Sequence, residues 1–313
     1  MNLQQLRYVS EVARRNLNVS EAAEALHTSQ PGVSKQIRGL EEELGTAIFV
    51  RQGRRFTALT DAGREIVAAV DRILSEVANL KAVGEEFAHQ AKGSLAVAVT
   101  HTQARYALPS VVGEFIRRFP QVKLKLLQGN PHQLARMVGA GEADVAIATE
   151  ALDEYPELVA IPCYQWHHCV VVPAGHALER VKPLTLEAIA AHPLVTYDPT
   201  FAGRTALDRA FAARNLHPEI VLTALDSDVI KSYVVLGLGV GIISSRAFRP
   251  GRDEGLVALD CGHLFPAQTT RLAFRRGAYL RGYTVEFIRL LAPRMRREDL
   301  ERLAGAAREN FSI

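Results

Sequence analysis

Cysteine is scarce in this sequence, with three residues in a chain of 313: Cys163, Cys169 and Cys261. Three cysteines cannot form a set of paired disulfides, and none has CxxC spacing, so the pattern favours a reducing compartment over secretion. His167 and His168 lie between the first two cysteines and could join them as metal ligands. The segment is more typical of a turn entering a buried strand, where cysteine packs as a small apolar residue. We therefore expect no metal site.

The sequence also lacks long hydrophobic runs and a strong charge of one sign. No stretch reaches the roughly 18 to 20 uninterrupted apolar residues of a membrane span, and segment 1–15 is amphipathic, unlike a signal peptide. We expect a cytoplasmic protein with no membrane partner. With 37 Lys and Arg against 34 Asp and Glu, the net charge of +3 permits nucleic-acid binding but does not argue for it alone.

Signatures of catalysis and of nucleotide binding are missing as well. The chain has no GxSxG, no HExxH and no carboxylate pair in a recognisable catalytic setting, so we predict no catalytic residues and no enzymatic activity. The glycines of segment 237–241 follow a predicted helix and enter a strand, the reverse of the order in a dinucleotide-binding turn. A helix C-terminus and close packing explain them better, and we expect no cofactor.

The first residues of the chain have the pattern of a helix-turn-helix. Apolar residues at helical spacing predict helices over 3–15 and 19–26, and a third helix from Gln30 onward. Only three residues separate the second helix from the third, which is the spacing of a helix-turn-helix. Pro31 falls in the first turn of the third helix, where its missing N–H costs nothing, and Ser29 or its neighbour can cap that helix.

The third helix and the segment after it carry groups suited to DNA. Two β-compatible pieces around Gly53, within 47–58, predict a hairpin wing. Hydroxyl, amide and basic side chains share the helix face opposite the apolar residues, and such groups suit base edges and phosphates. A merely solvated face is the ordinary alternative, but the turn and the basic hairpin favour DNA. We expect contacts with double-stranded operator DNA from Thr28, Ser29, Gln30, Pro31, Ser34, Lys35, Arg38, Arg51, Arg54 and Arg55.

A long helix is predicted from Asp61 onward, followed by a polar hinge over 89–93. Its apolar residues recur at alternating steps of four and three over about three heptads, which favours pairing with a second copy of the chain. An amphipathic helix packed on its own domain is the alternative. We expect the seam to form a homodimer through Ile66, Val70, Ile73, Val77 and Leu80.

Beyond residue 93, predicted strands and helices alternate. This order predicts an α/β domain with largely parallel strands, and its length predicts two lobes with a cleft between them. The strands are expected at 95–100, 122–128, 144–149, 169–172, 194–197, 220–224, 239–243 and 271–275, with helices over 107–119 and 131–140. The expected fold is thus an all-α winged helix-turn-helix over 1–59, a linker helix and hinge over 60–92, and a two-lobed effector-binding domain over 93–313. Lobe I is placed at about 93–162 and 266–300, and lobe II at about 163–265.

Polar residues at the ends of two predicted strands indicate a ligand site. Thr100 ends one strand, Thr102 and Gln103 lie in the loop before the next helix, and Thr149 ends another strand. Hydroxyls, an amide and backbone N–H groups then converge at the carboxyl ends of the strands, where anions and small molecules bind. Each threonine alone could be a simple cap, but two strand ends at one cleft favour a ligand.

Several segments resemble the LysR-type transcription regulators, and some of them resemble the branch of that family that activates the cysteine regulon. The first set comprises 18–41, 44–51 and 59–63, and the second comprises 100–109, 148–152 and 228–231. The resemblance covers nearly the whole chain and weakens after about residue 295. It implies effector lobes similar to periplasmic solute-binding proteins, a homodimer or homotetramer on operator DNA, and contact with RNA polymerase.

The resemblance also implies the effector and its contacts. The effector would be an acetylated serine, sulfate or another anion of sulfur assimilation, bound at the positions of Thr100, Thr102, Gln103, Thr149 and Ala202. The related proteins have threonine at the last position, so the missing hydroxyl predicts a weaker contact from the second lobe. A small-molecule-binding protein without specific DNA binding, and an enzyme acting on an acetylated amino acid, are the alternatives. Retention on DNA and turnover of acetylserine distinguish them.

Overall fold

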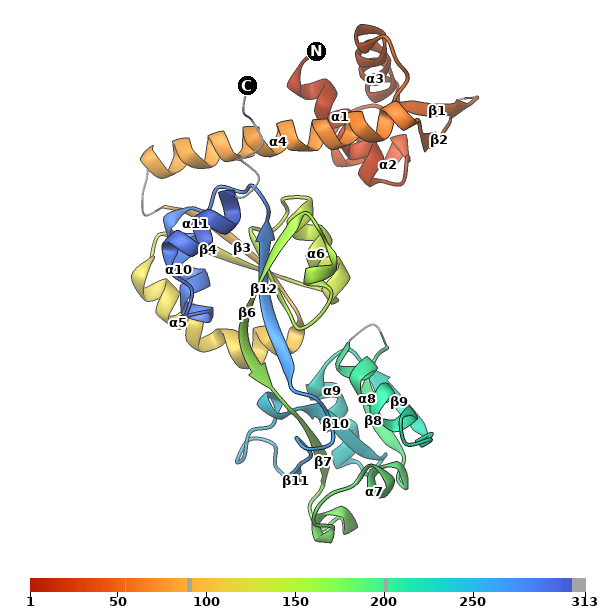
Figure 1. Ribbon diagram of the computed structural model, residues 1–313, viewed down its shortest axis with the longest axis vertical. Coiled ribbons are helices and arrows are strands. Elements are labelled where there is room, and N and C mark those ends of the chain that lie inside the picture. The colour runs from red at the N-terminus through yellow and green to blue at the C-terminus, as the bar shows by residue number, and fades with distance from the viewer. Residues whose placement is uncertain (54, 89–91, 200–201, 306–313) are drawn as a thin grey trace. The chain divides into compact units, whose positions relative to one another are not determined.

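The computed structural model describes residues 1–53, 55–88, 92–199 and 202–305 (Figure 1). The chain forms two compact units, residues 1–85 and residues 86–313. Among the described residues, no helix is both long enough and apolar enough to cross a membrane.

The first unit begins with three short helices, α1 (Leu3–Arg14), α2 (Val19–Ala25) and α3 (Gln30–Leu44). Each begins after a residue whose side chain accepts a backbone N–H of the first turn, which stabilises the helix start. One apolar face of each helix packs into a shared core. The fully buried members of this core include Val9, Val12, Ala22, Val33, Ile37, Leu40 and Ile48.

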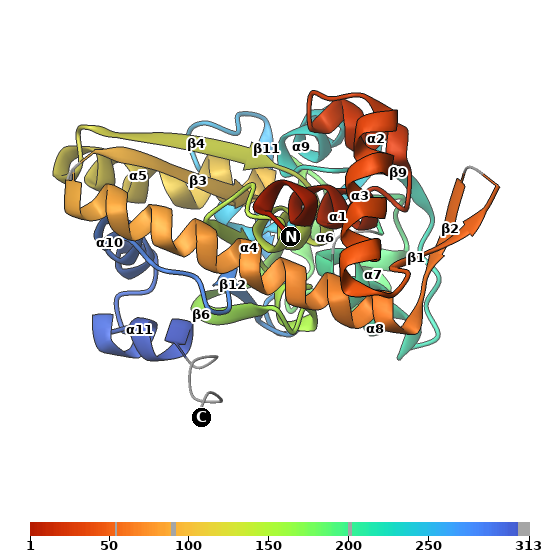
Figure 2. The ribbon, with the colours of Figure 1, turned by 90° about the horizontal axis from the view of Figure 1, so that it is seen from above.

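A two-stranded hairpin follows, with β1 (Phe49–Gln52) paired antiparallel to β2 (Arg55–Leu59). It projects away from α1, α2 and α3, and most of its residues are exposed (Figure 2). The long helix α4 (Asp61–Ala88) then starts close against Ile48, the residue before β1, because a Cβ at Gly63 would lie 2.0 Å from the backbone oxygen of Ile48. Only glycine fits at this close approach.

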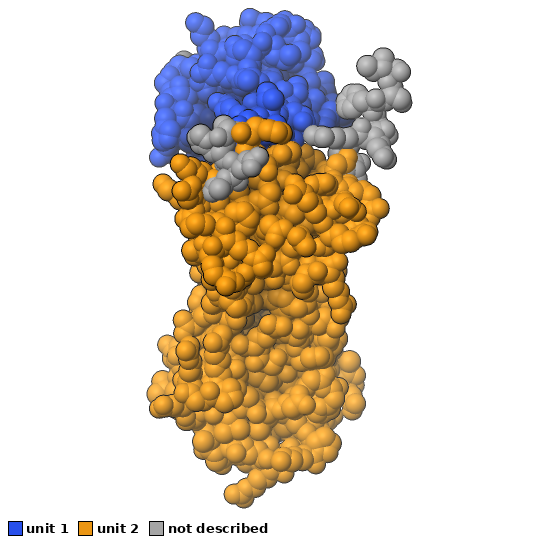
Figure 3. Space-filling model, turned by 90° about the vertical axis from the view of Figure 1, so that its left-hand side faces the viewer, with its two compact units in different colours: residues 1–85 blue, residues 86–313 orange. Residues whose placement is uncertain are grey.

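The second unit, orange in Figure 3, contains two five-stranded sheets. The sheet of lobe I has the strand order β4-β3-β5-β12-β6. Helices α5, α10 and α11 pack on one face of this sheet and α6 packs on the other. The elements are β3 (Gly93–Val99), β4 (Val122–Gln128), β5 (Val145–Ala148), β6 (Leu158–Trp166), β12 (Gln268–Arg275), α5 (Leu108–Arg118), α6 (Pro131–Gly139), α10 (Gly282–Leu291) and α11 (Arg297–Gly305).

The sheet of lobe II has the order β11-β7-β10-β8-β9. Helices α7 and α8 cover one face and α9 covers the other. The chain crosses between the sheets twice, at His167 between β6 and β7, and over 261–267 between β11 and β12. The elements are β7 (His168–Pro173), β8 (Leu194–Tyr197), β9 (Ile220–Ala224), β10 (Val240–Ser244), β11 (Leu256–Asp260), α7 (Leu186–Ala190), α8 (Ala202–Ala212) and α9 (Ser227–Val235).

The predicted fold class is confirmed, and so are its largely parallel strands. Four of the five strands in each sheet run in the same direction, whereas β12 in lobe I and β7 in lobe II run antiparallel to their neighbours. The expected turn at Cys163 is wrong, because Cys163 lies within strand β6, and β11 was not predicted. Both missed strands lie next to the two crossings between the lobes.

The glycines of segment 237–241 take the structural roles expected of them. Gly237 follows the end of α9 with a φ of 78°, a left-handed conformation that suits glycine after a helix. A Cβ at Gly239 would lie 2.4 Å from the backbone oxygen of Pro193, and one at Gly241 would meet Val171. These glycines therefore end a helix and allow close packing of β10.

Candidate functional site

Helix α3 presents a polar face to the outside. The Ser29 Oγ accepts the N–H of Gly32 at 3.3 Å, and Pro31 occupies the first turn, as expected for the start of this helix. Because Val33, Ile37 and Leu40 are buried, the opposite side chains point outward. Of the expected DNA contacts, Ser29, Gln30, Pro31, Lys35 and Arg38 are exposed, and Thr28 and Ser34 are half-buried.

The two described arginines of the wing lie in different environments. Arg55 is exposed on β2. Arg51 on β1 forms an ion pair with Glu41, and its guanidinium carbon lies 5.0 Å from the centre of the Phe56 ring. Arg54 lies outside the described residues. The positive charge of Arg51 is thus already paired within the chain.

The predicted seam of α4 splits into two kinds of residue. Val70 is 3% exposed and, together with Ile66, packs against the core of the first unit. Val77 is half-buried, whereas Ile73 and Leu80 are 40% and 73% exposed. The start of the seam therefore packs on its own unit, as in the alternative interpretation, and the exposed residues lie farther along the helix.

A small cavity of about 40 Å³ lies between the lobes of the second unit. All four described effector candidates line it, at the ends of β3 and β5 and in the first turn after β3. Of the described lining residues, only Glu150 carries a charge. The lining residues are Thr100, Thr102, Gln103, Thr149, Glu150, Trp166, Tyr197 and Ser244.

Side chains from several strands fix the orientation of these groups. The Gln103 amide donates to Thr270 Oγ1 at 3.2 Å, and its carbonyl oxygen accepts the Tyr164 hydroxyl. The indole N–H of Trp166 donates to Thr149 Oγ1 at 3.3 Å. Because both amide groups of Gln103 have partners, its orientation is preset before any ligand binds.

The lobe II wall of the cavity centres on Tyr197. Its hydroxyl lies 2.6 Å from Ser227 Oγ and accepts the backbone N–H of Ser244 at 3.1 Å. Burial raises the pKa of Tyr197 to about 12, so the hydroxyl stays neutral. This wall consists of neutral donors and acceptors held by backbone and side-chain hydrogen bonds.

The sequence suggested that Thr102 and Gln103 lie in a loop, but the structure places both residues in helical segments. Helical structure begins at His101, and Gln103–Ala107 form a π-helical turn, η1. Ala202 begins α8, and its side chain is not among those described. Sequence reasoning missed Glu150, Trp166, Tyr197 and Ser244. The one available signal was that Tyr197 ends a predicted strand.

A larger cleft of about 970 Å³ shares Thr149 and Glu150 with the cavity. Its walls carry charges of both signs, since Arg136 and Arg209 face the same space as Glu154. Positive charge is therefore available beside the cavity but does not line it among the described residues.

One group of described residues has the composition of a metal site. Ligand atoms of His101, Asp226 and Asp228 lie within 4.8 Å of one another. Arg105 Nε, however, lies 2.7 Å from Asp228 Oδ2, and Asp226 accepts two backbone N–H groups at the start of α9. A guanidinium already compensates the negative charge here, so we interpret the group as part of a salt-bridge network.

Comparisons with known proteins cover both units. The helix-turn-helix of bacterial regulatory proteins of the lysR family matches residues 3–64, and the LysR substrate binding domain matches residues 88–296. The chain is 53% identical to the HTH-type transcriptional regulator CysB of Burkholderia cenocepacia over 313 residues, all of both chains. It is 52% identical to the regulator SsuR of the same organism over 309 residues, 99% of each chain.

The second unit also has a solved relative. The cofactor-binding domain of the Cbl transcriptional regulator is 46% identical, with a TM-score of 0.66, and the match covers 67% of this chain and 92% of that one. These family matches span both the DNA-binding motif and the effector-binding lobes described above. The chain therefore belongs to the LysR family of transcription regulators, which are DNA-binding proteins with a small-molecule-binding domain and not enzymes.

Proposed function

We propose that the protein activates genes of sulfur assimilation and cysteine biosynthesis in the cytoplasm, in response to a small sulfur-related effector. The resemblance of 100–109, 148–152 and 228–231 to the cysteine-regulon branch supports this, together with full-length similarity to a regulator named CysB. The protein would bind operator DNA as a homodimer or homotetramer and contact RNA polymerase when the effector binds.

The exposed polar face of α3 would enter the major groove, with Gln30, Lys35 and Arg38 nearest the bases and phosphates. On the wing, Arg55 is exposed and would contact phosphate, whereas Arg51 is held by Glu41. The exposed positions of α4 would pair two chains, and the symmetry of that pair would set the spacing of the two half-sites.

The chemistry of the small cavity supports an oxygen-rich anion as the effector. Hydroxyl groups of Thr100, Thr102 and Ser244 surround it. Among the described lining residues there is no lysine or arginine, and the one charged residue is Glu150, which also lines the larger cleft. Neutral donors held in place can bind an anion in a protein interior, where each hydrogen bond is stronger than in water. Pockets for drug-sized ligands usually measure about 300 to 1,000 Å³. A cavity of about 40 Å³ is far below that range, so it favours a small ion such as sulfate over an acetylated serine, which would need more space than the cavity alone provides.

Calorimetric titration of the full-length protein with sulfate, N-acetylserine, O-acetylserine and adenylyl sulfate tests the effector assignment. Thr100→Val keeps the shape of the side chain and removes its hydroxyl, so affinity for the true effector should fall by roughly 2-fold to 150-fold. Thr223→Val, at an exposed position of β9, is the matched control and should not change the affinity. Equal affinities in the wild type and Thr100→Val would place the effector elsewhere.

Ala202→Thr tests the expected weak contact from lobe II. The variant restores the hydroxyl found in the related regulators, so it should strengthen effector binding if residue 202 faces the cavity. When both variants are measured, Thr100→Val reports the contribution of lobe I to effector affinity and Ala202→Thr reports that of lobe II. A null result for Ala202→Thr alone would overturn only the assignment of residue 202.

A further inference from the structure

The small cavity takes its walls from both lobes, so its shape depends on how the lobes are held. Thr100 and Thr149 belong to lobe I, whereas Tyr197 and Ser244 belong to lobe II. Two chain crossings connect the lobes, and connections of this kind commonly act as hinges in two-lobed binding domains. A further contact that bridges the lobes would then favour the arrangement in which the cavity is formed.

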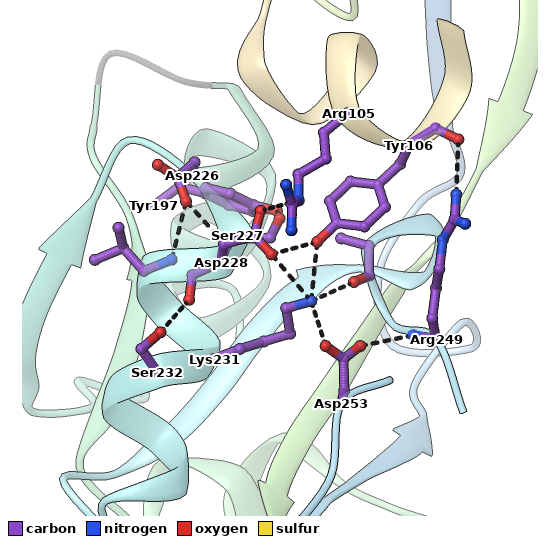
Figure 4. Close-up of polar contacts among 12 residues, drawn as sticks. Arg105, Tyr106, Tyr197, Asp226, Ser227, Asp228, Lys231, Ser232, Arg249 and Asp253 are labelled. Atoms are coloured by element: carbon purple, nitrogen blue, oxygen red, sulfur yellow. Dashed lines mark hydrogen bonds and ion pairs between the residues drawn. The ribbon is translucent and has the colours of Figure 1, made fainter. Parts of the chain in front are cut away.

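Tyr106 makes such a contact from η1 of lobe I (Figure 4). Its hydroxyl donates to Asp228 Oδ1 at 2.5 Å and accepts from Lys231 Nζ at 2.9 Å, and both partners belong to α9 of lobe II. Its backbone oxygen accepts from Arg249 at 3.5 Å. The Tyr106 ring also has Lys231 Nζ at 5.2 Å from its centre, within the range of a cation–π interaction.

Lys231 depends on Tyr106 for one of its hydrogen bonds. The side chain is only 7% exposed, and Nζ also donates to Asp253 Oδ1 at 2.7 Å and to the backbone oxygen of Ala247 at 2.9 Å. An ammonium has three N–H donors, so Tyr106 completes the set. Burial alone would lower the pKa of Lys231, but hydrogen bonds to Asp253 and Tyr106 outweigh it and raise the pKa. Without the Tyr106 hydroxyl, the third donor keeps only the Asp228 carboxylate, whose Oδ1 lies 3.3 Å from Nζ within lobe II, so the hydrogen bond between the lobes is lost.

The same contact is directly connected to the cavity walls. Gln103 and Tyr106 lie in one π-helical turn, three residues apart. On the other side, Asp228 follows Ser227, whose Oγ lies 2.6 Å from the Tyr197 hydroxyl. A displacement at Tyr106 would therefore move a residue of each wall.

We propose that Tyr106 is a positioning residue of the effector cavity, which fixes lobe II against lobe I through Asp228 and Lys231. This inference rests on the proposed effector site. When the contact is weakened, fewer molecules have a formed cavity, and the apparent affinity for the effector falls in proportion to that fraction. A change from a mostly formed cavity to one formed in about a tenth of the molecules raises the apparent Kd about 10-fold.

Tyr106→Phe in the full-length protein tests the proposal, because it removes the hydroxyl and keeps the ring. The apparent Kd for sulfate should rise about 10-fold by calorimetry. Hydrogen exchange in the ligand-free protein should become faster in segments 226–231 and 244–249, which a change confined to η1 would leave unaffected.

Tyr283→Phe is the matched control. It removes a hydroxyl that donates to the backbone oxygen of Ser94 at 3.0 Å, inside lobe I, and should change neither sulfate affinity nor exchange in those two segments. If Thr100→Val weakens sulfate binding while Tyr106→Phe changes neither affinity nor exchange, the inference is overturned and the effector site stands. If sulfate does not bind the wild type, the effector assignment fails. Exchange in 226–231 and 244–249 then decides the lobe contact alone: faster exchange supports it, and unchanged exchange overturns it.

Discussion

Glu41, in the last turn of α3, holds Arg51 of the wing in an ion pair. The same carboxylate accepts the backbone N–H of Ile48 at 2.8 Å and of Phe49 at 3.2 Å. Glu41 therefore ties the end of α3 to the first strand of the wing, and its side chain is only 10% exposed. The arginine that the sequence offered as a DNA contact is thus also a structural partner.

We predict that the two described wing arginines differ in the salt dependence of DNA binding. Removing one phosphate contact reduces the slope of log K against log salt by about 0.9. Arg55→Ala should reduce the slope by about that amount, because Arg55 is exposed. Arg51→Ala should change the slope much less, because Glu41 already neutralises Arg51. Filter binding to operator DNA over a series of salt concentrations measures both slopes. A reduction of about one for Arg51→Ala would show that its charge reaches a phosphate.

We predict that alanine at Gln30 or Arg38 lowers affinity for operator DNA more than for random DNA. Removing a specific base contact costs about 1 to 3 kcal/mol, whereas removing a phosphate contact weakens all sequences alike. Lys35→Ala should show the second pattern if it contacts phosphate. Titrations at fixed salt separate the two effects, with Arg117→Ala, an exposed arginine of α5, as the control. Unchanged operator affinity in all three variants would remove α3 as the recognition helix.

The local elements were predictable because their signals lie within a few neighbouring residues. The cap at Ser29, the proline in the first turn of α3 and the glycine after α9 each act within one turn of helix. Strand β6 was missed because its burial does not alternate regularly, and it is defined by pairing with β12, about a hundred residues away. The two reversed strands, β7 and β12, each follow a crossing between the sheets, and no local pattern identifies such a crossing.

The cavity was only half predictable for a related reason. Thr100 and Thr149 end neighbouring parallel strands of one sheet, and a local pattern can identify strand ends. Tyr197 and Ser244 come from the other lobe, and no local pattern gives the distance between lobes. The seam of α4 shows a further limit of sequence-based prediction. Heptad spacing and the spacing of an ordinary amphipathic helix both place an apolar residue at position 70, and Val70 packs in the core of the first unit.

We predict that the exposed residues of α4 carry dimerisation. Ile73→Asp combined with Leu80→Asp should weaken the dimer, because an unpaired charge at an apolar contact is costly. Light scattering at several concentrations measures the change in mass. Val70→Ala is the control, since it should lower the stability of the first unit without changing the mass at concentrations where the protein is folded. A double variant that remains fully dimeric would place the main interface outside α4.

We predict a stability loss in mild acid that depends on His168. The ring is 1% exposed, lies 5.0 Å from Trp166 and 5.6 Å from Phe265, and neither ring nitrogen has a hydrogen-bond partner among the described residues. Burial, and secondarily the charge of His167, lowers its pKa to about 4. The unfolded chain, with a pKa near 6.5, then binds the extra proton between pH 6.5 and 4. Stability is therefore complete above pH 6.5 and is lost as the pH falls towards 4.

The size of this loss follows from the two pKa values, and at pH 5 it amounts to about 2 kcal/mol relative to pH 7. His168→Leu removes the titrating ring, so the difference in unfolding free energy between pH 7 and pH 5 should shrink by about that amount. Trp166 is the only tryptophan of the chain and touches the ring, so its fluorescence during urea unfolding reports on this unit. His217→Gln, at an exposed position, should leave the difference unchanged. If the His168→Leu variant keeps the full pH dependence, a group other than His168 controls the acid sensitivity. In that case His168 must have a hydrogen-bond partner in its protonated form.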